Sequence, residues 1–327
     1  MSDTASRSGT SHRPEELEQH RVELTGYCYR MLGSAFEAED AVQETLVRAW
    51  RGLHRFEGRA ALRSWLYHIA TNVCFDLLKG RQRRARPIDL GPAWSAGSPL
   101  GSPLAETTWV EPVPDSSVLA AGADPAEQAI SRESVRLAFV AALQHLPPRQ
   151  RAVLILREVL RWRAAEVAEL LGTSSASVNS ALQRARSTLG ERGVSDSDPV
   201  QPMDDTQRAL VTRYVDAFER YDLDSLVSLL HEDATQSMPP YDLWMRGPEQ
   251  MRAWWSGPGI ECRGSRLVAT AANSCPAFGQ YRPSGPGGAF EPFSLHVLEL
   301  TGDRITDITY FLDTDRLFPL FGLPPSL

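Results

Sequence analysis

The sequence has few cysteines and no long apolar segment. Its four cysteines, Cys28, Cys74, Cys262 and Cys275, form no C-x-x-C pair, so neither a disulfide framework nor a zinc site is expected. Apolar runs such as Ala152–Leu156 are far shorter than the roughly 20 residues of a membrane span. The first residues lack the basic and apolar regions of a secretory signal. These absences predict a cytoplasmic protein with reduced thiols and without a metal, a cofactor or membrane contact.

Positive charge is also missing from one long segment. The chain has 327 residues, a length that suits two or three domains, and its net charge is -7. Residues 1–86 and 129–193 are basic, with net charges of +3 and +5, whereas residues 87–128 and 194–327 are acidic, with -6 and -9. Such asymmetry indicates nucleic-acid contact confined to the basic units. Ordinary variation in surface charge is the alternative.

Proline-rich segments separate the basic units from the rest of the chain. Residues 87–127 contain seven prolines, no Lys or Arg, and no sustained periodicity. This composition predicts a flexible acidic linker over residues 87–128. A second Pro-, Ser- and Asp-rich break spans residues 193–206. Three domains are therefore expected, over residues 14–86, 129–193 and 204–327.

The first basic unit shows only helical spacing. Apolar residues recur at helical intervals over residues 62–78, and the opposite face carries Tyr67, His68 and Asn72. A cationic tail follows, with Lys79, Arg81, Arg83, Arg84 and Arg86. Rings beside cations suit single-stranded nucleic acid, because bases stack on the rings while Arg meets phosphates. Packing of these rings against another helix is the alternative.

The preceding segment, EAEDAVQETLVRAW, predicts a helix with Val42, Leu46 and Trp50 in the core. Its exposed face would carry Asp40, Gln43 and Glu44. The patterns D-x-x-Q-E-x-x-x-x-x-W and W-L-x-x-I-A-x-N-x-x-x-D resemble the promoter-opening domain of extracytoplasmic-function sigma factors of the bacterial sigma-70 family. The match covers most of residues 20–86.

This resemblance implies two sets of contacts for the first unit. Asp40, Gln43 and Glu44 would dock on the clamp helices of the β′ subunit of RNA polymerase core. The loop 55–63 and the next helix would hold the unstacked -10 strand, with one base flipped out of the duplex. The implied -10 residues are Tyr67, His68, Asn72, Lys79, Arg81, Arg83 and Arg84.

The second basic unit contains a helix-turn-helix pattern. In AAEVAELLGTSSASVNSALQ, Gly172 lies in the turn, Ser174 or Ser175 can cap the second helix, and Val178 and Leu182 form its core. A major groove would meet Ser177, Asn179, Ser180, Gln183, Arg184 and Arg186. A three-helix packing motif can imitate this spacing, but its order after the first unit resembles the -35-reading domain of the same sigma factors. Many relatives carry Lys or Arg where this chain has Asn179.

The third unit changes character, with helical patterns followed by strand-like runs near 266–272, 278–282, 293–300 and 305–312. It resembles, over residues 206–318, the SnoaL-like branch of the cone-shaped α+β fold shared with ketosteroid isomerase and nuclear transport factor 2. A pocket in such a cone would involve His231, Asp233, Tyr241 and Trp244. The same residues are compatible with catalysis, with ligand sensing, or with capping and cone lining in a protein-contacting domain.

The expected fold is therefore multidomain, with two all-α helical domains, the second carrying the helix-turn-helix, followed by an α+β cone-shaped SnoaL-like domain. The expected function is that of a non-enzymatic sigma factor. It would bind RNA polymerase core through the β′ clamp helices and β, recognise promoter DNA and melt the -10 region. Its SnoaL-like domain would regulate it by intramolecular contact. The alternatives are a ligand-responsive transcription factor and a cyclase or isomerase fused to a DNA-binding region.

Overall fold

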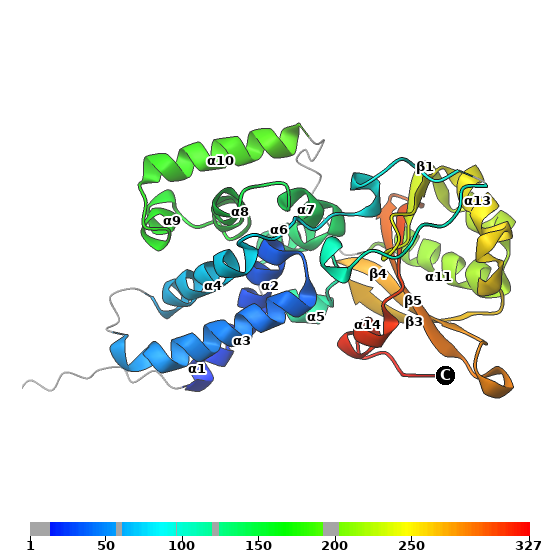
Figure 1. Cartoon of the computed structure of the whole chain (residues 1–327), viewed down its shortest axis with the longest axis horizontal. Helices are drawn as coiled ribbons and strands as arrows, with labels where there is room; N and C mark the ends of the chain where they lie inside the picture. Colours follow the sequence, from blue (N-terminus) through cyan, green and yellow to red (C-terminus); the bar gives the residue numbers. More distant parts are fainter. Residues whose placement is uncertain (1–13, 57–60, 96, 120–123, 192–202) are drawn as a thin grey trace, which may run out of the picture.

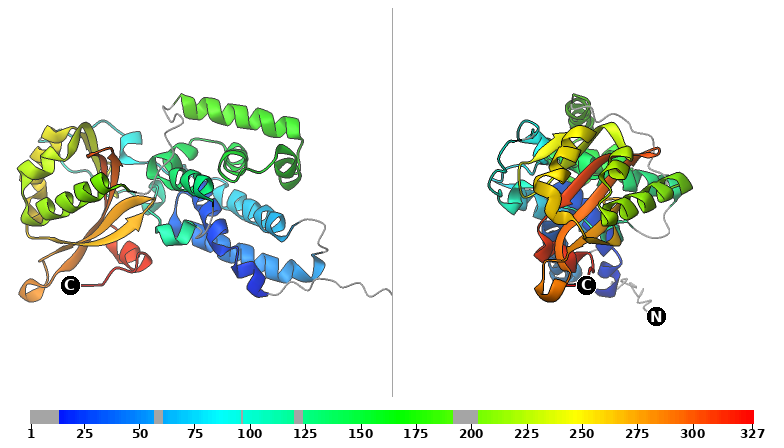
Figure 2. Two further views of the ribbon diagram at one scale, coloured as in Figure 1. Left: turned by 180° about the vertical axis from the view of Figure 1, so that it is seen from behind. Right: turned by 90° about the vertical axis from the view of Figure 1, so that its right-hand side faces the viewer.

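The structure is a computed structural model that describes residues 14–56, 61–95, 97–119, 124–191 and 203–327. Two helical units and a segment between them pack against a third unit built on one sheet (Figure 1). The left view in Figure 2 places the sheet and its helices on one side of the molecule and α10 at the outer edge of the other side. Within the described residues, no helix is long and apolar enough to cross a membrane.

The first unit consists of helices that pack around Tyr27 and Cys28 on α2, which are fully buried. Its helices are α1 (Pro14–Glu18), α2 (Arg21–Leu32), α3 (Ala35–Gly52), η1 (Leu53–Arg55) and α4 (Leu62–Leu78). Gly33 ends α2 with a φ of 74°, and the Ser34 side chain accepts a hydrogen bond from the Glu37 amide to start α3. The helix predicted over residues 62–78 is present with those bounds.

The second unit carries the expected helix-turn-helix. Its helices are α6 (Pro125–Val135), α7 (Leu137–Leu143), α8 (Pro148–Leu154), a π-helical turn η4 (Ile155–Val159), α9 (Ala164–Leu170) and α10 (Ser175–Gly190). Gly172 turns the chain with a φ of 59°, and Ser174 caps α10 by accepting from the Ser177 amide. The buried face of α10 is Val178, Leu182, Ala185 and Leu189.

The third unit is an α+β fold on a six-stranded mixed sheet in the order β2-β1-β6-β5-β4-β3, in which only β1 and β6 pair in parallel. The strands are β1 (Leu230–Ser237), β2 (Trp244–Arg246), β3 (Arg266–Ala272), β4 (Cys275–Arg282), β5 (Glu291–Thr301) and β6 (Arg304–Phe311). The helices are α11 (Asp205–Arg220), α12 (Leu223–Ser228), α13 (Pro248–Ser256), η5 (Pro258–Cys262), η6 (Pro286–Gly288) and α14 (Thr314–Leu320).

The segment expected to be a flexible linker packs between the units instead. It contains η2 (Pro87–Asp89), η3 (Glu106–Thr108) and α5 (Asp115–Val118). Trp109, Val110, Val113 and Val118 are each at most 3% exposed. Prolines restrict the unfolded backbone, which lowers the entropy lost when a segment docks, and the apolar residues among them supply the burial. The linker expectation is therefore corrected for residues 87–95 and 97–119, which pair with the first and third units.

The two faces of the sheet belong to different hydrophobic cores. One face packs under α11, α12 and α13 and forms a separate cluster around Tyr214, Leu298 and Ile308. The other face, with Ala277 and Val297, is continuous with the core of the two helical units. The described helical units, the linker and this face of the sheet thus share one apolar core.

Candidate nucleic-acid interface

The outer face of α10 presents the residues predicted to meet a major groove. All six are exposed: Ser177, Asn179, Ser180, Gln183, Arg184 and Arg186. The Arg186 guanidinium donates to the Glu158 carboxylate at 2.8 Å, so this cation is partly tethered to η4. The geometry leaves Gln183 accessible for base contact, and its role in reading a base stays a prediction.

The residues predicted to hold a single strand are partly covered by the second unit. Tyr67 is fully buried, and its ring lies 5.1 Å from that of Trp162 and 5.2 Å from that of Tyr27. The Arg63 guanidinium lies over both Tyr67 and Trp162. Of the two alternatives for Tyr67, packing holds in this arrangement and exposure does not, because contact with Tyr27 and Trp162 removes the ring from solvent.

His68 and Asn72 lie beside the same contact. The His68 ring is hydrogen-bonded through Nδ1 to the Leu170 carbonyl oxygen of α9, at 2.9 Å. The Asn72 amide lies 3.2 Å from His68 Nε2 and is exposed. Base stacking on the buried Tyr67 therefore requires the second unit to move away from α4. Residues 57–60 of the predicted strand-holding loop lie outside the described residues.

The cationic tail after α4 divides into exposed and buried residues. Lys79, Arg81 and Arg83 are exposed. Arg84 is only 7% exposed and forms an ion pair with Glu37 at 2.9 Å. It also donates to the Trp109 carbonyl oxygen at 2.6 Å. Arg84 was predicted to contact DNA, but in this arrangement it is buried, because α3 supplies Glu37 and the packed linker supplies the Trp109 carbonyl as its partners.

The α3 surface predicted to bind polymerase is open to solvent. Asp40, Gln43 and Glu44 are exposed, and Glu44 accepts from Arg48 at 2.6 Å. Trp50 was predicted in the core but is 61% exposed. Eight residues of an α-helix turn by about 80° beyond two full turns, so Trp50 leaves the Val42 stripe.

One asparagine joins all the parts of the molecule. Asn273 and Ser274 form the two-residue turn between β3 and β4, and both have positive φ, as a type I′ hairpin requires. The Asn273 amide group donates at 2.6 Å to the Tyr29 hydroxyl of the first unit and at 2.6 Å to the Val135 carbonyl of the second. Its oxygen accepts from the Val113 amide at 3.0 Å.

This junction is fully buried and extends to neighbouring groups. Asn273 and Tyr29 have no exposed surface. The Tyr29 hydroxyl donates to the Glu111 carbonyl at 2.8 Å, and burial raises the Tyr29 pKa well above its usual value. The Asp115 carboxylate accepts from the Ser274 amide at 2.7 Å. The predicted intramolecular contact between the third unit and the helical units therefore has a specific polar centre.

The interior of the cone is small, and the described residues that line it include no carboxylate. Its cavity has a volume of about 40 Å³, well below the roughly 300 Å³ of small-molecule sites. His296 lies nearby, hydrogen-bonded to the Tyr214 hydroxyl and to Gln280, and burial lowers its pKa to about 3. A buried neutral imidazole with both nitrogens occupied is a structural group.

The predicted pocket residues do not come together inside the cone. His231 accepts from the Asp233 amide at 3.1 Å, and Asp233 is exposed on β1. The Trp244 indole donates to the Gly91 carbonyl of the linker at 2.9 Å. Tyr241 lines a different pocket, between the linker and the third unit. The pocket expectation is therefore wrong for this arrangement, because Asp233 is exposed to solvent and the linker covers Trp244 on β2.

The sequence did not predict which residues form contacts between the units. These residues are Tyr29, Arg84, Trp162 and Asn273. A signal for the turn exists, since Asn273 lies between two strand-like runs and asparagine tolerates the positive φ of tight turns. No local pattern indicates which distant groups the tip of that hairpin meets.

Three family models match the chain. Sigma-70 region 2 matches residues 17–84, sigma-70 region 4 matches residues 136–189, and a SnoaL-like domain matches residues 211–308.

The chain is 47% identical over 315 residues to the ECF RNA polymerase sigma factor SigG of Mycobacterium tuberculosis, which covers 95% of this chain and 83% of the relative. It is 32% identical over 221 residues to SigJ of the same species, covering 67% of this chain and 62% of that protein. The crystal structure of SigJ matches in fold with a TM-score of 0.60 at 22% identity, covering 95% of this chain and 100% of that one.

Proposed function

The chain belongs to the ECF RNA polymerase sigma factors, and we propose that its SnoaL-like unit regulates it in cis by holding the two helical units closed. As a sigma factor it binds RNA polymerase core, recognises promoter DNA and acts in transcription initiation. Its proposed site of action is the cytoplasm, where RNA polymerase core and promoter DNA are present. We assign the -10 and core-binding function to residues 14–86, the -35 function to residues 129–193 and regulation to residues 204–327.

The Asn273 junction carries this proposal. One side chain bonds the first unit at Tyr29, the linker at Val113 and the second unit at Val135. While these bonds hold, the Trp162 ring packs on the Tyr67 ring, and the Leu170 carbonyl oxygen is hydrogen-bonded to the His68 ring. Promoter opening needs the α4 face, so the closed arrangement is inactive, and separation of the second unit from α4 exposes the strand-holding surface.

The remaining site assignments follow from exposure and charge. The α3 residues Asp40, Gln43 and Glu44 bind the β′ clamp helices, since they stay open to solvent in the closed arrangement. Asn72 with Lys79 contacts the -10 strand after opening. The α10 face reads the -35 element through Gln183, with Arg186 on phosphate.

The three side-chain hydrogen bonds of Asn273 that hold the closed arrangement are called the Asn273 lock below, and substitution of Asn273 tests it. Asn273→Gly keeps the positive φ of the turn but removes three side-chain hydrogen bonds, which are worth about 1 kcal/mol each. The closed arrangement then weakens by about 3 kcal/mol, roughly 100-fold in its equilibrium constant. Ser274→Gly is the matched control, because it loosens the same turn and its hydroxyl makes no hydrogen bond to described residues.

We expect the Asn273→Gly protein without polymerase to bind a single-stranded -10 oligonucleotide at least tenfold more tightly than wild type. Hydrogen exchange in α4 and α9 should also accelerate. Ser274→Gly should match wild type in both measurements. The proposal is refuted if Asn273→Gly and Ser274→Gly behave alike while run-off transcription shows both to be folded and active.

A further inference from the structure

A second cavity lies where linker residues 103–112 meet the SnoaL-like unit. Its volume is about 500 Å³, within the range of small-molecule sites and more than ten times the volume of the cone cavity. The linker wall includes Leu104, Glu106 and Trp109, and the opposite wall consists of residues 239–241, 311–313, 316 and 317. Neither wall alone encloses the pocket.

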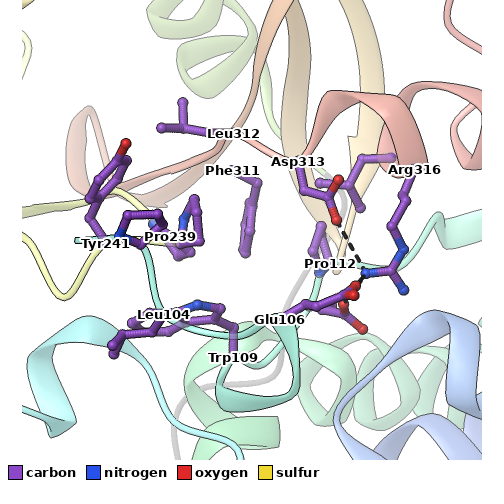
Figure 3. A pocket seen from close by; sticks show the side chains of 14 residues that line it. Leu104, Glu106, Trp109, Pro112, Pro239, Tyr241, Phe311, Leu312, Asp313 and Arg316 are labelled. Atoms are coloured by element: carbon purple, nitrogen blue, oxygen red, sulfur yellow. Dashed lines mark hydrogen bonds and ion pairs between the residues drawn. The ribbon is translucent and has the colours of Figure 1, made fainter.

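The pocket has an apolar end and an acidic end. Tyr241, Pro239 and Leu104 lie together at one end (Figure 3). At the other end, Asp313 and Glu106 surround Arg316. Phe311 lies between the two ends and continues the apolar wall. Such a division suits an amphipathic molecule with one polar group.

The acidic end carries more carboxylates than cations, even when Arg84 is counted, which is outside the lining and forms an ion pair with Glu111 Oε2 at 3.7 Å. Glu106, Glu111 and Asp313 are the described carboxylates of the lining, and Arg316 is its one guanidinium. Arg316 approaches Glu111 at 3.3 Å and Asp313 at 3.2 Å, and it also pairs with Glu106. Burial raises the pKa values of Glu111 and Asp313, so an additional cation would stabilise their ionised forms.

Two buried polar atoms of the lining also lack hydrogen-bond partners among the described residues. They are the Trp109 indole nitrogen, on a residue that is 3% exposed, and Glu111 Oε2, on a residue that is 7% exposed. An unpaired buried polar atom costs about 1 to 3 kcal/mol. A cationic ligand that donates to Glu111 Oε2 would recover the part of this energy that belongs to the carboxylate.

We propose that this pocket binds a small amphipathic organic cation, with an ammonium or amidinium group between Glu106, Glu111 and Asp313 and an apolar body against Leu104, Tyr241 and Phe311. The carboxylate excess selects a cation over an anion. The open apolar end selects an organic cation over a metal ion, which needs several oxygen ligands and gains nothing from aromatic and aliphatic walls.

Binding at this site stabilises the docked form, in which the linker packs against the SnoaL-like unit. Because the pocket needs both walls, a ligand binds the docked form alone and favours it in proportion to ligand concentration over Kd. Arg316 also lies 4.1 Å from the centre of the Phe36 ring on α3, so the acidic end adjoins the first helical unit. This regulatory consequence rests on the proposed function, whereas the binding itself does not.

Three probes with one ring and different charges test the site. We expect benzamidinium to bind the full-length protein with a Kd on the order of 1 mM, as its size allows. Neutral benzamide should bind at least tenfold more weakly, and benzoate should not bind. Calorimetry at fixed ionic strength measures all three.

Matched charge removals locate the binding. Glu106→Gln and Asp313→Asn should each weaken benzamidinium binding at least threefold. Asp303→Asn, which removes an exposed carboxylate from the turn between β5 and β6, should leave it unchanged. In a ¹⁵N spectrum, the indole resonance that disappears in Trp109→Phe should shift when benzamidinium is added to wild type.

The proposal is overturned if benzamide binds as tightly as benzamidinium, if Asp303→Asn and Glu106→Gln weaken binding equally, or if the Trp109 resonance does not move. These outcomes are independent of the Asn273 experiment. If benzamidinium does not bind, the proposal for Asn273 still stands. If Asn273→Gly behaves like Ser274→Gly, the measured binding of benzamidinium still stands.

Discussion

The pH dependence of stability should change when Asp307 is replaced. Asp307 lies on β6, where its carboxylate accepts hydrogen bonds from the hydroxyls of Thr235 and Thr309. Burial raises its pKa to about 6, and the negative charge of Glu299 adds to the shift, while Arg86 opposes it. The ordinary value is 3.8. Folding therefore favours the protonated acid.

The sign and size of the effect follow from this shift. A raised folded-state pKa stabilises the protein below pH 3.8 relative to higher pH, and this stability is lost as the pH rises through 6. Each pKa unit corresponds to 1.36 kcal/mol, so the ionised carboxylate costs about 3 kcal/mol at pH 8. About half of that cost is already present at pH 5. Asp307→Asn removes the titration and retains an oxygen that can accept from a threonine.

Urea unfolding followed by tryptophan fluorescence measures the change. The free energy of unfolding of Asp307→Asn, relative to wild type, should rise by about 1.5 kcal/mol between pH 5 and pH 8. Asp303→Asn controls for removal of an exposed carboxylate. A difference between Asp307→Asn and wild type that stays constant over this pH range would refute the reasoning, whatever its absolute value.

Three further predictions concern polymerase and promoter. Reversing Asp40 and Glu44 together to Arg should weaken binding to polymerase core in a pull-down without altering the melting temperature, because both are exposed; undiminished binding would contradict the assignment. Gln183→Ala should cost about 1 to 3 kcal/mol at one -35 position, whereas Arg186→Ala should weaken binding to all sequences alike; electrophoretic shifts on a substitution series separate the two. Asn72→Ala should reduce run-off transcription from duplex promoters more than from pre-opened templates, and equal losses would indicate a packing defect.

Helical periodicity predicted the parts of the fold that rest on local pattern. The 62–78 helix, the turn at Gly172 and the buried face of α10 follow from spacing that any amphipathic helix must satisfy. Strands β1 and β2 were missed, because β1 has a polar sequence with two exposed residues in succession and a shifted register with β6. That irregularity removes the alternation by which a strand is recognised.

Exposure of the candidate surfaces was predicted correctly where it depends on the pattern of one helix alone. The α10 and α3 faces are exposed as expected, but Tyr67 and Arg84 are buried by residues more than 20 positions away in the chain. Hydrophobic spacing indicates which face of a helix is buried in its own unit. It does not indicate whether a second unit covers the opposite face. The linker shows the same limit, since its composition indicates disorder while its few apolar residues pack between the units.

The shared apolar core sets an order of events during synthesis. The two helical units leave the ribosome before the sheet that completes their core, and the Asn273 hairpin follows the end of α10 by more than 80 residues. At bacterial elongation rates, this interval lasts roughly 4 to 16 s. During that time the nascent sigma units lack the hairpin that closes them. A new chain can therefore bind polymerase core before the Asn273 hydrogen bonds form. The rate at which translation completes the hairpin thus competes with the rate at which core enzyme binds the sigma units.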